Sequence, residues 1–297
     1  MGVIDVLNLL VASLLLAGIY TTMSIGMTII YGVMKIINLA HAGFMMLGAY
    51  FVYEVFNRLG VHPILGALLA FPVFFLLGMA VHWLLVRWLP VSDQPTLPSL
   101  LLLFGLWLVL QNVGYAAWGN LDRSIYTDMT LATVRLGPLT LSVVQLVVFT
   151  VAVISVVLLQ FMLTRTWFGR AVRALTQNPF AGQLVGIDTA RMSRLSFGLG
   201  IAFAGLAGAL LASLYSFDPD FGRPFLLRSF VIIVLGGLES FTGVALGALI
   251  LALVETFSVQ FVPAGYQMAI SFSLLVVALL VLPGGVASLI ERRGRTT

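Results

Sequence analysis

Long apolar stretches separated by short polar connections run along almost the whole chain. A helix needs about 20 predominantly apolar residues to cross a bilayer. Six stretches reach this length without a break, and they occupy residues 6–30, 63–89, 97–118, 139–163, 195–217 and 266–287. Together with two further, interrupted stretches they predict an all-α integral membrane protein. We expect a polytopic helix bundle of about eight transmembrane segments, forming one membrane-spanning domain over residues 1–297.

Residues 229–262 form an apolar stretch that is too long for one crossing. At 1.5 Å per residue its 34 residues would make a helix of about 50 Å, against a hydrocarbon core of about 30 Å. Gly236 and Gly237 lie in the middle of this stretch, and Gly243 follows. We therefore expect a short helix near residues 229–235, an irregular turn, and a second helix from about Gly243.

Residues 31–56 show the same kind of interruption, because Lys35, Asn38 and His41 fall within an otherwise apolar run. A broken helix in each half of a transport protein points to the substrate path. The sequence thus predicts a path lined by Asn38, His41, Gly43, Gly236, Gly237 and Ser240. In the alternative interpretation Lys35 lies at a membrane face, and Asn38 and His41 are packing residues with satisfied hydrogen bonds.

Composition strengthens the membrane prediction, since 61% of the residues are hydrophobic and only 9% are charged. Soluble domains carry about 25% charged residues, which they need to cover a surface that faces water. The chain has no cysteine, which excludes disulfides and thiolate metal sites. We expect neither a metal nor another cofactor to be bound by this chain.

Two acidic residues fall within the second half of the apolar sequence. Glu239 lies in the glycine-rich turn, and Glu255 lies about three turns into the helix that follows. A charged side chain in the middle of a membrane costs at least ~2.5 kcal/mol, so each needs a partner, water or a proton. Three roles stay open for Glu255: a counter-charge, a substrate contact, or a residue at the end of a helix.

Basic residues collect in the loop 164–194 and in the C-terminal tail. The arginines concerned are Arg165, Arg170, Arg173, Arg191 and Arg194 in the loop and Arg292, Arg293 and Arg295 in the tail. Positive charge is enriched in cytoplasmic segments, so both segments are predicted to face the cytoplasm. If residues 31–56 cross the membrane once, five crossings precede the loop, and the N-terminus lies outside.

The cytoplasmic loop contains the signals of a short helix. Asn178 suits the N-cap, Pro179 the first helical position and Gly186 the position just past the end, which predicts a helix over residues 179–185. Phe180 and Leu184 share one apolar face of this helix. A two-turn helix is not stable alone in water. We expect this face either to enter a groove on an ATPase subunit, as coupling helices do, or to lie on lipid headgroups.

Several stretches, in order and spacing, resemble the permeases of branched-chain amino acid (Liv-type) ABC importers. The resemblance covers roughly residues 10–289. The stretches that carry it are Ile37-Asn38-Leu39-Ala40-His41 with Gly43, Gly169-Arg170-Ala171-Val172-Arg173-Ala174 with Gly186-Ile187-Asp188, Val234-Leu235-Gly236-Gly237-Leu238 with Ser240 and Gly243, and Pro283 with Gly285. The chain departs from the family pattern at Ala42 and Gly43, where the family usually has Gly and then often an acidic or polar residue. This departure leaves the substrate open.

The resemblance implies a multi-pass subunit of the bacterial plasma (inner) membrane that couples ATP hydrolysis by partner subunits to transport. The implied partners are a second permease, identical or homologous, two ATP-binding cassette subunits, and a periplasmic or surface substrate-binding protein. The chain lacks G-x-x-x-x-G-K-[ST], H-E-x-x-H and G-x-S-x-G, so we do not expect it to be an enzyme. A permease of the same family for an amide, urea or organic acid is one alternative. A stand-alone secondary transporter is another, although it would have no use for a helix that docks on an ATPase.

Overall fold

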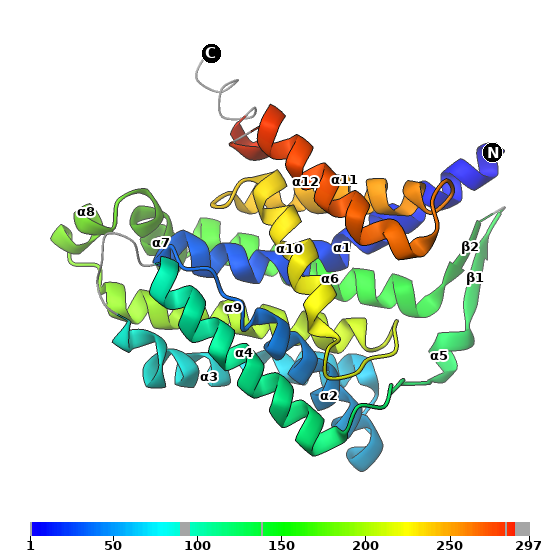
Figure 1. The fold of residues 1–297 in the computed structure, drawn as a ribbon, viewed down its shortest axis with the longest axis horizontal. Coiled ribbons are helices and arrows are strands. Elements are labelled where there is room, and N and C mark those ends of the chain that lie inside the picture. Colours follow the sequence, from blue (N-terminus) through cyan, green and yellow to red (C-terminus); the bar gives the residue numbers. More distant parts are fainter. Residues whose placement is uncertain (1, 90–95, 138, 283, 289–297) are drawn as a thin grey trace.

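The computed structural model describes residues 2–89, 96–137, 139–282 and 284–288, most of which lie in helices (Figure 1). Seven of the described helices are long and apolar enough to cross a membrane. They are α1 (Val3–Met34), α3 (Pro63–Leu84, followed by the 3-10 turn η1, Val86–Trp88), α4 (Thr96–Trp118), α6 (Val143–Arg165), α9 (Thr189–Leu211), α11 (Phe241–Ser258) and α12 (Gln267–Val281, preceded by the turn η2, Ala264–Tyr266), whose candidate span continues to Ser288. The prediction of an all-α polytopic membrane protein is therefore confirmed.

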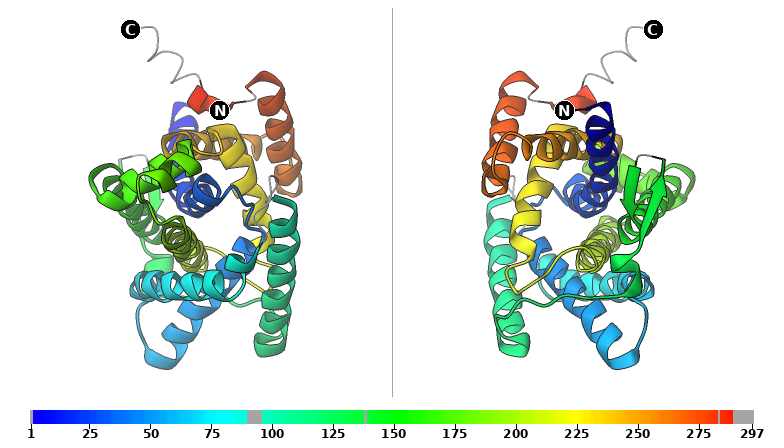
Figure 2. Two further views of the ribbon diagram at one scale, coloured as in Figure 1. Left: turned by 90° about the vertical axis from the view of Figure 1, so that its left-hand side faces the viewer. Right: turned by 90° about the vertical axis from the view of Figure 1, so that its right-hand side faces the viewer.

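The bundle is organised around α1 and α9, which lie side by side and appear near the middle when the molecule is viewed from either end (Figure 2). Small residues on α9 let neighbouring helices approach closely. A Cβ atom at Gly208 would lie 1.9 Å from the carbonyl oxygen of Met45, and one at Gly205 would lie 2.3 Å from the Phe74 ring. Close packing of this kind is what holds helices together in lipid, where little hydrophobic force acts between them. The small-residue face of α9 is thus an internal contact of this chain.

Both predicted interruptions are present. The helix α1 ends at Met34, residues 35–40 are not helical, and α2 (His41–Leu59) follows. The second stretch divides into α10 (Gly222–Gly236) and α11, separated by residues 237–240. The helix before this second break begins at Gly222, earlier than predicted, because it includes Arg223 and Arg228, which lie outside the apolar stretch used for the prediction.

Several short elements were not predicted. A two-stranded antiparallel hairpin joins β1 (Thr133–Leu136) to β2 (Leu139–Ser142), so that α6 begins at Val143 and not at residue 139, and the short helix α5 (Asp128–Leu131) precedes β1. The amphipathic helix α7 (Trp167–Gln177) occupies the first half of the basic loop. The tail arginines Arg292, Arg293 and Arg295, together with Pro283, lie outside the described residues.

The two ends of the bundle carry different elements (Figure 1). The N-terminal end of α1 lies with α5 and the hairpin at one end, and α7 lies with α8 (Pro179–Leu184) at the other. The far end of α1 contacts α7. The helix α2 runs toward the end of the bundle that α7 does not occupy (Figure 1), and near the end of α2 Glu54 accepts a 2.7 Å hydrogen bond from Trp118 Nε1. The basic loop and the N-terminus are therefore at opposite ends.

Candidate functional site

The first break places two polar side chains inside the bundle. Asn38 is 1% exposed, and neither its amide oxygen nor its amide nitrogen has a hydrogen-bond partner among the described residues. His41 is fully buried, and its Nε2 donates a 2.8 Å hydrogen bond to the Met23 carbonyl oxygen in α1. Its Nδ1 has no partner within the described chain. Buried polar atoms are normally paired, so this segment holds capacity for hydrogen bonds that the isolated chain does not use.

Gly43, in contrast to Asn38 and His41, lies at a contact between two helices. A Cβ atom at this position would lie 2.9 Å from Cδ1 of Leu110, so the missing side chain lets α2 pack against α4. In the described structure Gly43 therefore contacts a neighbouring helix, on the turn of α2 that follows His41.

The second break depends on close backbone approach. A Cβ atom at Gly236 would lie 2.4 Å from the Gly243 carbonyl oxygen, and Gly237 has a φ of +105°, a conformation that L side chains rarely adopt. Ser240 Oγ accepts a 3.1 Å hydrogen bond from the Gly243 amide and caps α11. A substitution such as Gly237→Val would strain the backbone as well as fill space.

A cleft of about 720 Å³ opens beside the second break. Its walls come from α6, α7, residues 237–242 and the segment that begins near the end of α12. Most of the lining surface is apolar, and the polar side chains in it are those of Gln160, Thr164, Arg173, Thr176, Gln177, Glu239, Ser240, Thr242 and Ser288. Gly237 and Ser240 of the predicted path line the cleft, whereas Asn38, His41, Gly43 and Gly236 do not. A cleft of this size, with both apolar and polar side chains in its walls, can accommodate a small solute.

An ion pair joins the two breaks. Lys35, from the first, contacts Glu239, from the second, and Glu239 also lines the cleft. Sequence analysis singled out both residues but did not pair them, because they are far apart along the chain.

The basic loop contains the predicted short helix. Asn178 Oδ1 accepts a 3.0 Å hydrogen bond from the Ala181 amide, Pro179 is the first helical residue, and Gly186 has a φ of +82°. The helix α8 ends one residue earlier than predicted, at Leu184. Phe180 and Leu184 are 69% and 74% exposed, so the apolar face of α8 is uncovered in this chain. The helix itself is confirmed, and what covers it stays a prediction.

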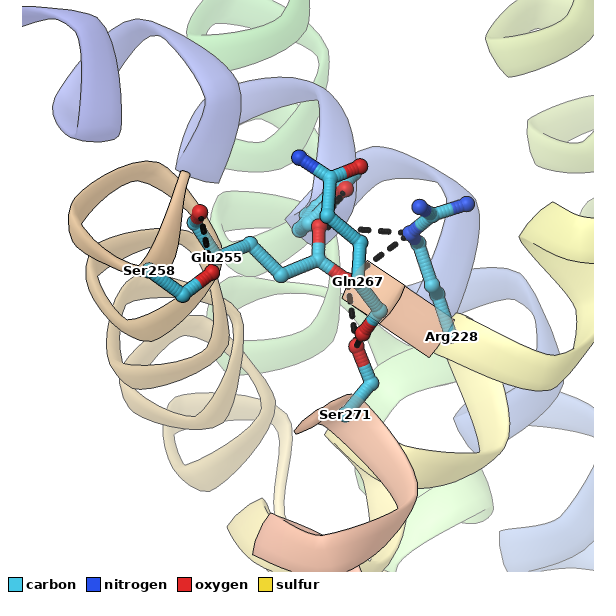
Figure 3. A network of polar contacts seen from close by, with 6 residues as sticks. Arg228, Glu255, Ser258, Gln267 and Ser271 are labelled. Atoms are coloured by element: carbon cyan, nitrogen blue, oxygen red, sulfur yellow. Dashed lines mark hydrogen bonds and ion pairs between the residues drawn. The ribbon is translucent and has the colours of Figure 1, made fainter. Parts of the chain in front are cut away.

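A buried charge network links four helices (Figure 3). Glu255 in α11 is 2% exposed and accepts hydrogen bonds of 2.9 and 3.2 Å from Nε of Arg228 in α10. It also accepts a 2.5 Å bond from Ser271 Oγ in α12 and a bond from the Tyr20 hydroxyl in α1. The structure thus gives Glu255 a counter-charge. Sequence analysis missed Arg228, although an arginine directly before a long apolar stretch was a usable signal.

Acidic side chains gather at the end of the bundle opposite α7. Asp220 accepts a 2.7 Å hydrogen bond from Gln111 Nε2, and Asp218 Oδ1 accepts one of 3.1 Å from the Asp220 amide. Burial raises the pKa of Asp218 above its ordinary value. Arg58 pairs with Glu54 at 2.5 Å on the same rim.

Comparisons with known proteins agree with this architecture. Residues 9–279 match the family model described as branched-chain amino acid transport system / permease component. The high-affinity branched-chain amino acid transport system permease protein LivH of Escherichia coli K12 is 29% identical over 282 residues, which cover 91% of this chain and 92% of that protein. The corresponding protein BraD of Pseudomonas aeruginosa is 27% identical over 291 residues, covering 94% and 95%. The permease protein LivM of Salmonella typhimurium is 27% identical over 272 residues, covering 78% and 60%. No solved structure matches the chain. Because the family model spans most of its length, this membrane protein belongs to the family of permease components of branched-chain amino acid transport systems.

Proposed function

We propose that the chain is a membrane-spanning permease subunit of an ABC importer for branched-chain or related small amino acids. The observation that carries this proposal is α8. It is a capped two-turn helix in the most basic loop of the chain, and its two large apolar side chains are mostly exposed. A helix of this length needs a partner to be stable, and an ATPase groove supplies one. The chain itself is a transport subunit and not an enzyme.

The proposed complex contains a second permease, identical or homologous, two ATP-binding cassette subunits that hydrolyse ATP, and a periplasmic or surface substrate-binding protein. The proposed location is the bacterial plasma (inner) membrane, with α7 and α8 in the cytoplasm. Five loop arginines at that end support this orientation, since cytoplasmic segments are enriched in positive charge.

The proposed substrate path runs between the two breaks. One wall of the path is placed at the first break, because three polar atoms there have no hydrogen-bond partner among the described residues: two on Asn38 and one on His41. The other wall is placed at the second break, because Gly237 and Ser240 line the cleft there. Unpaired polar groups of this kind can hold a polar solute briefly, which is what a permease needs when a binding protein delivers the solute. Gly43 and Gly236 contribute by letting helices approach closely beside the path.

A stand-alone secondary transporter is the less favoured candidate, because nothing in such a protein would cover Phe180 and Leu184. A permease of the same family for an amide, urea or organic acid differs from our proposal only in its solute.

The proposal is tested by reconstituting the chain in proteoliposomes with its cognate second permease, ATPase and binding protein. We expect uptake of radiolabelled leucine that requires both ATP and the binding protein. Leucine uptake by the permeases alone, driven by an ion gradient, would contradict the ABC assignment. ATP-dependent uptake of acetamide or urea but not of leucine would support the family and reject the amino acid substrate.

A further inference from the structure

The guanidinium of Arg228 uses only one of its edges. Its Nε donates to both carboxylate oxygens of Glu255, but its two terminal nitrogens have no hydrogen-bond partner among the described residues. In Figure 3 these two nitrogens point away from Glu255. The Arg228 side chain is 14% exposed, whereas Glu255 is almost completely enclosed. Four N–H donors in a planar fork therefore face accessible space.

This fork lies close to the ends of two helices, because Glu255 is three residues before the end of α11 and its partner Ser271 is four residues after the start of α12. Tyr20, which shares Glu255 with Arg228, lies in the longer helix α1, about four turns before its end at Met34. A charged guanidinium within a membrane-spanning helix bundle is disfavoured against lipid, so we expect the exposed part of Arg228 to face water or protein. Tyr20 also lies one turn before Met23, whose carbonyl accepts the hydrogen bond from His41. The charge network is therefore next to the first side of the proposed path.

We propose that Arg228 is a substrate contact, whose free edge binds the carboxylate of the transported amino acid in a two-point hydrogen bond. This inference rests on the proposed transport function. Arginine is suited to the task because its fork matches the two oxygens of a carboxylate. Glu255, fixed in turn by Tyr20 and Ser271, holds the opposite edge and sets the direction of the fork.

The paired charges also favour a zwitterion over a simple anion. A single arginine would attract any anion, but Arg228 and Glu255 together are neutral and form a dipole. A zwitterionic amino acid can align its own dipole against this one, with its carboxylate at Arg228. The ring of Phe225 lies 5.7 Å from the guanidinium, and the ring of Tyr215 lies 6.3 Å from Phe225, so apolar surface is available beside the charge.

Arg228→Lys separates this role from a purely structural ion pair. A lysine can still pair with Glu255, but it presents a single ammonium and not a fork. In the reconstituted complex we expect leucine uptake to fall about tenfold to a hundredfold, as for loss of a charged hydrogen bond, with assembly and basal ATP hydrolysis retained. Arg87→Lys is the control, because Arg87 stacks between Trp83 and Trp88 without an ion pair among the described residues. Normal uptake by Arg228→Lys would overturn the proposal.

A second measurement decides the matter if the lysine variant does not assemble. The wild-type permease pair, purified without binding protein, is heated with leucine or with leucinamide, which lacks the carboxylate. Ligands that bind the native state raise its unfolding temperature, so we expect stabilisation by leucine and not by leucinamide. No difference between the two ligands would overturn the carboxylate contact. Wild-type complexes that fail to take up any amino acid would instead reject the proposed function.

Discussion

Lys35 and Glu239 form an ion pair that connects the first interrupted helix to the second, although 204 residues separate them in the sequence. Each lies in the non-helical segment of its own break. The pair is partly exposed, with 33% and 46% of the two side chains accessible. Ion pairs with this much exposure contribute only about 0–1 kcal/mol to stability. We therefore expect its effect on transport to exceed its effect on folding.

Charge reversal tests this contact. Lys35→Glu or Glu239→Lys alone places like charges beside the cleft and should separate the two breaks. Repulsion of about 1 kcal/mol would lower leucine uptake roughly fivefold. The double variant Lys35→Glu/Glu239→Lys should restore uptake, measured in proteoliposomes, with unfolding temperatures close to that of the wild type. Independent, additive losses in the double variant would show that the two residues do not act as a pair.

Asn38 gives a prediction in which stability and transport change in opposite directions. Leaving a buried polar group without a partner costs about 1–3 kcal/mol, so Asn38→Leu, of similar size, should raise the free energy of unfolding by about 1 kcal/mol. Leucine uptake should fall, because the unpaired Asn38 amide would no longer be present to form hydrogen bonds with the solute. Asn112→Leu on α4 is the control: its amide already bonds to the Leu108 carbonyl oxygen, so no gain is expected. Thermal unfolding in detergent and leucine uptake measure the two effects. Lower stability with normal uptake would indicate a packing role.

The cleft beside the second break can be narrowed without touching its strained glycine. Leu238 and Thr242 both line the cleft, and replacing both with tryptophan should reduce leucine uptake while basal ATP hydrolysis continues. The control replaces Leu280 and Val281, which are 79% and 69% exposed on α12, with tryptophan. Equal uptake by the two double variants would mean that the solute does not pass through this cleft.

The apolar face of α8 gives a prediction about coupling. Phe180→Asp/Leu184→Asp should abolish substrate-stimulated ATP hydrolysis, because a charged face would not enter an apolar groove. Both residues are largely exposed in this chain, so insertion and unfolding temperature should change little. Gln183→Asp introduces a charge at an exposed position of the same helix and serves as the control. If stimulation persists in the double variant, lipid headgroups and not the ATPase cover this face.

Local signals in the sequence were sufficient for several features. Asn178, Pro179 and Gly186 specify α8 because caps and positive φ values depend on nearby residues. The break at Gly237 follows from the length of the stretch and its glycines.

Features that depend on distant partners could not be predicted in this way. The Lys35–Glu239 and Arg228–Glu255 pairs join separate helices, and nothing local in the sequence specifies either pairing. The helix α7 was missed because its polar face resembles a loop when hydropathy alone is considered. Its apolar face is apparent only once Val172 and Leu175 pack into the bundle.

The position of the N-terminus provides the last prediction. The structure places the start of α1 and the loop helices α7 and α8 at opposite ends of the bundle (Figure 1). If that loop is cytoplasmic, Gly2 lies outside. The chain has no cysteine, so single cysteines at Gly2 and at Gln183 can be compared directly. A membrane-impermeant maleimide applied to intact cells should label the first and not the second.

The result also decides how α2 is arranged in the membrane. Five crossings between the N-terminus and the loop require α2 and residues 35–40 to span the membrane together. The end of α2 lies beside Trp118, far from α7, as such a crossing requires. Labelling at position 183 but not at position 2 would mean that the whole subunit has the opposite orientation in the membrane. Phe180 and Leu184 would then lie on the outer side, where no ATPase subunit could bind them. Absence of label at both positions, with both labelled after the cells are opened, would mean that residues 31–56 re-enter without crossing.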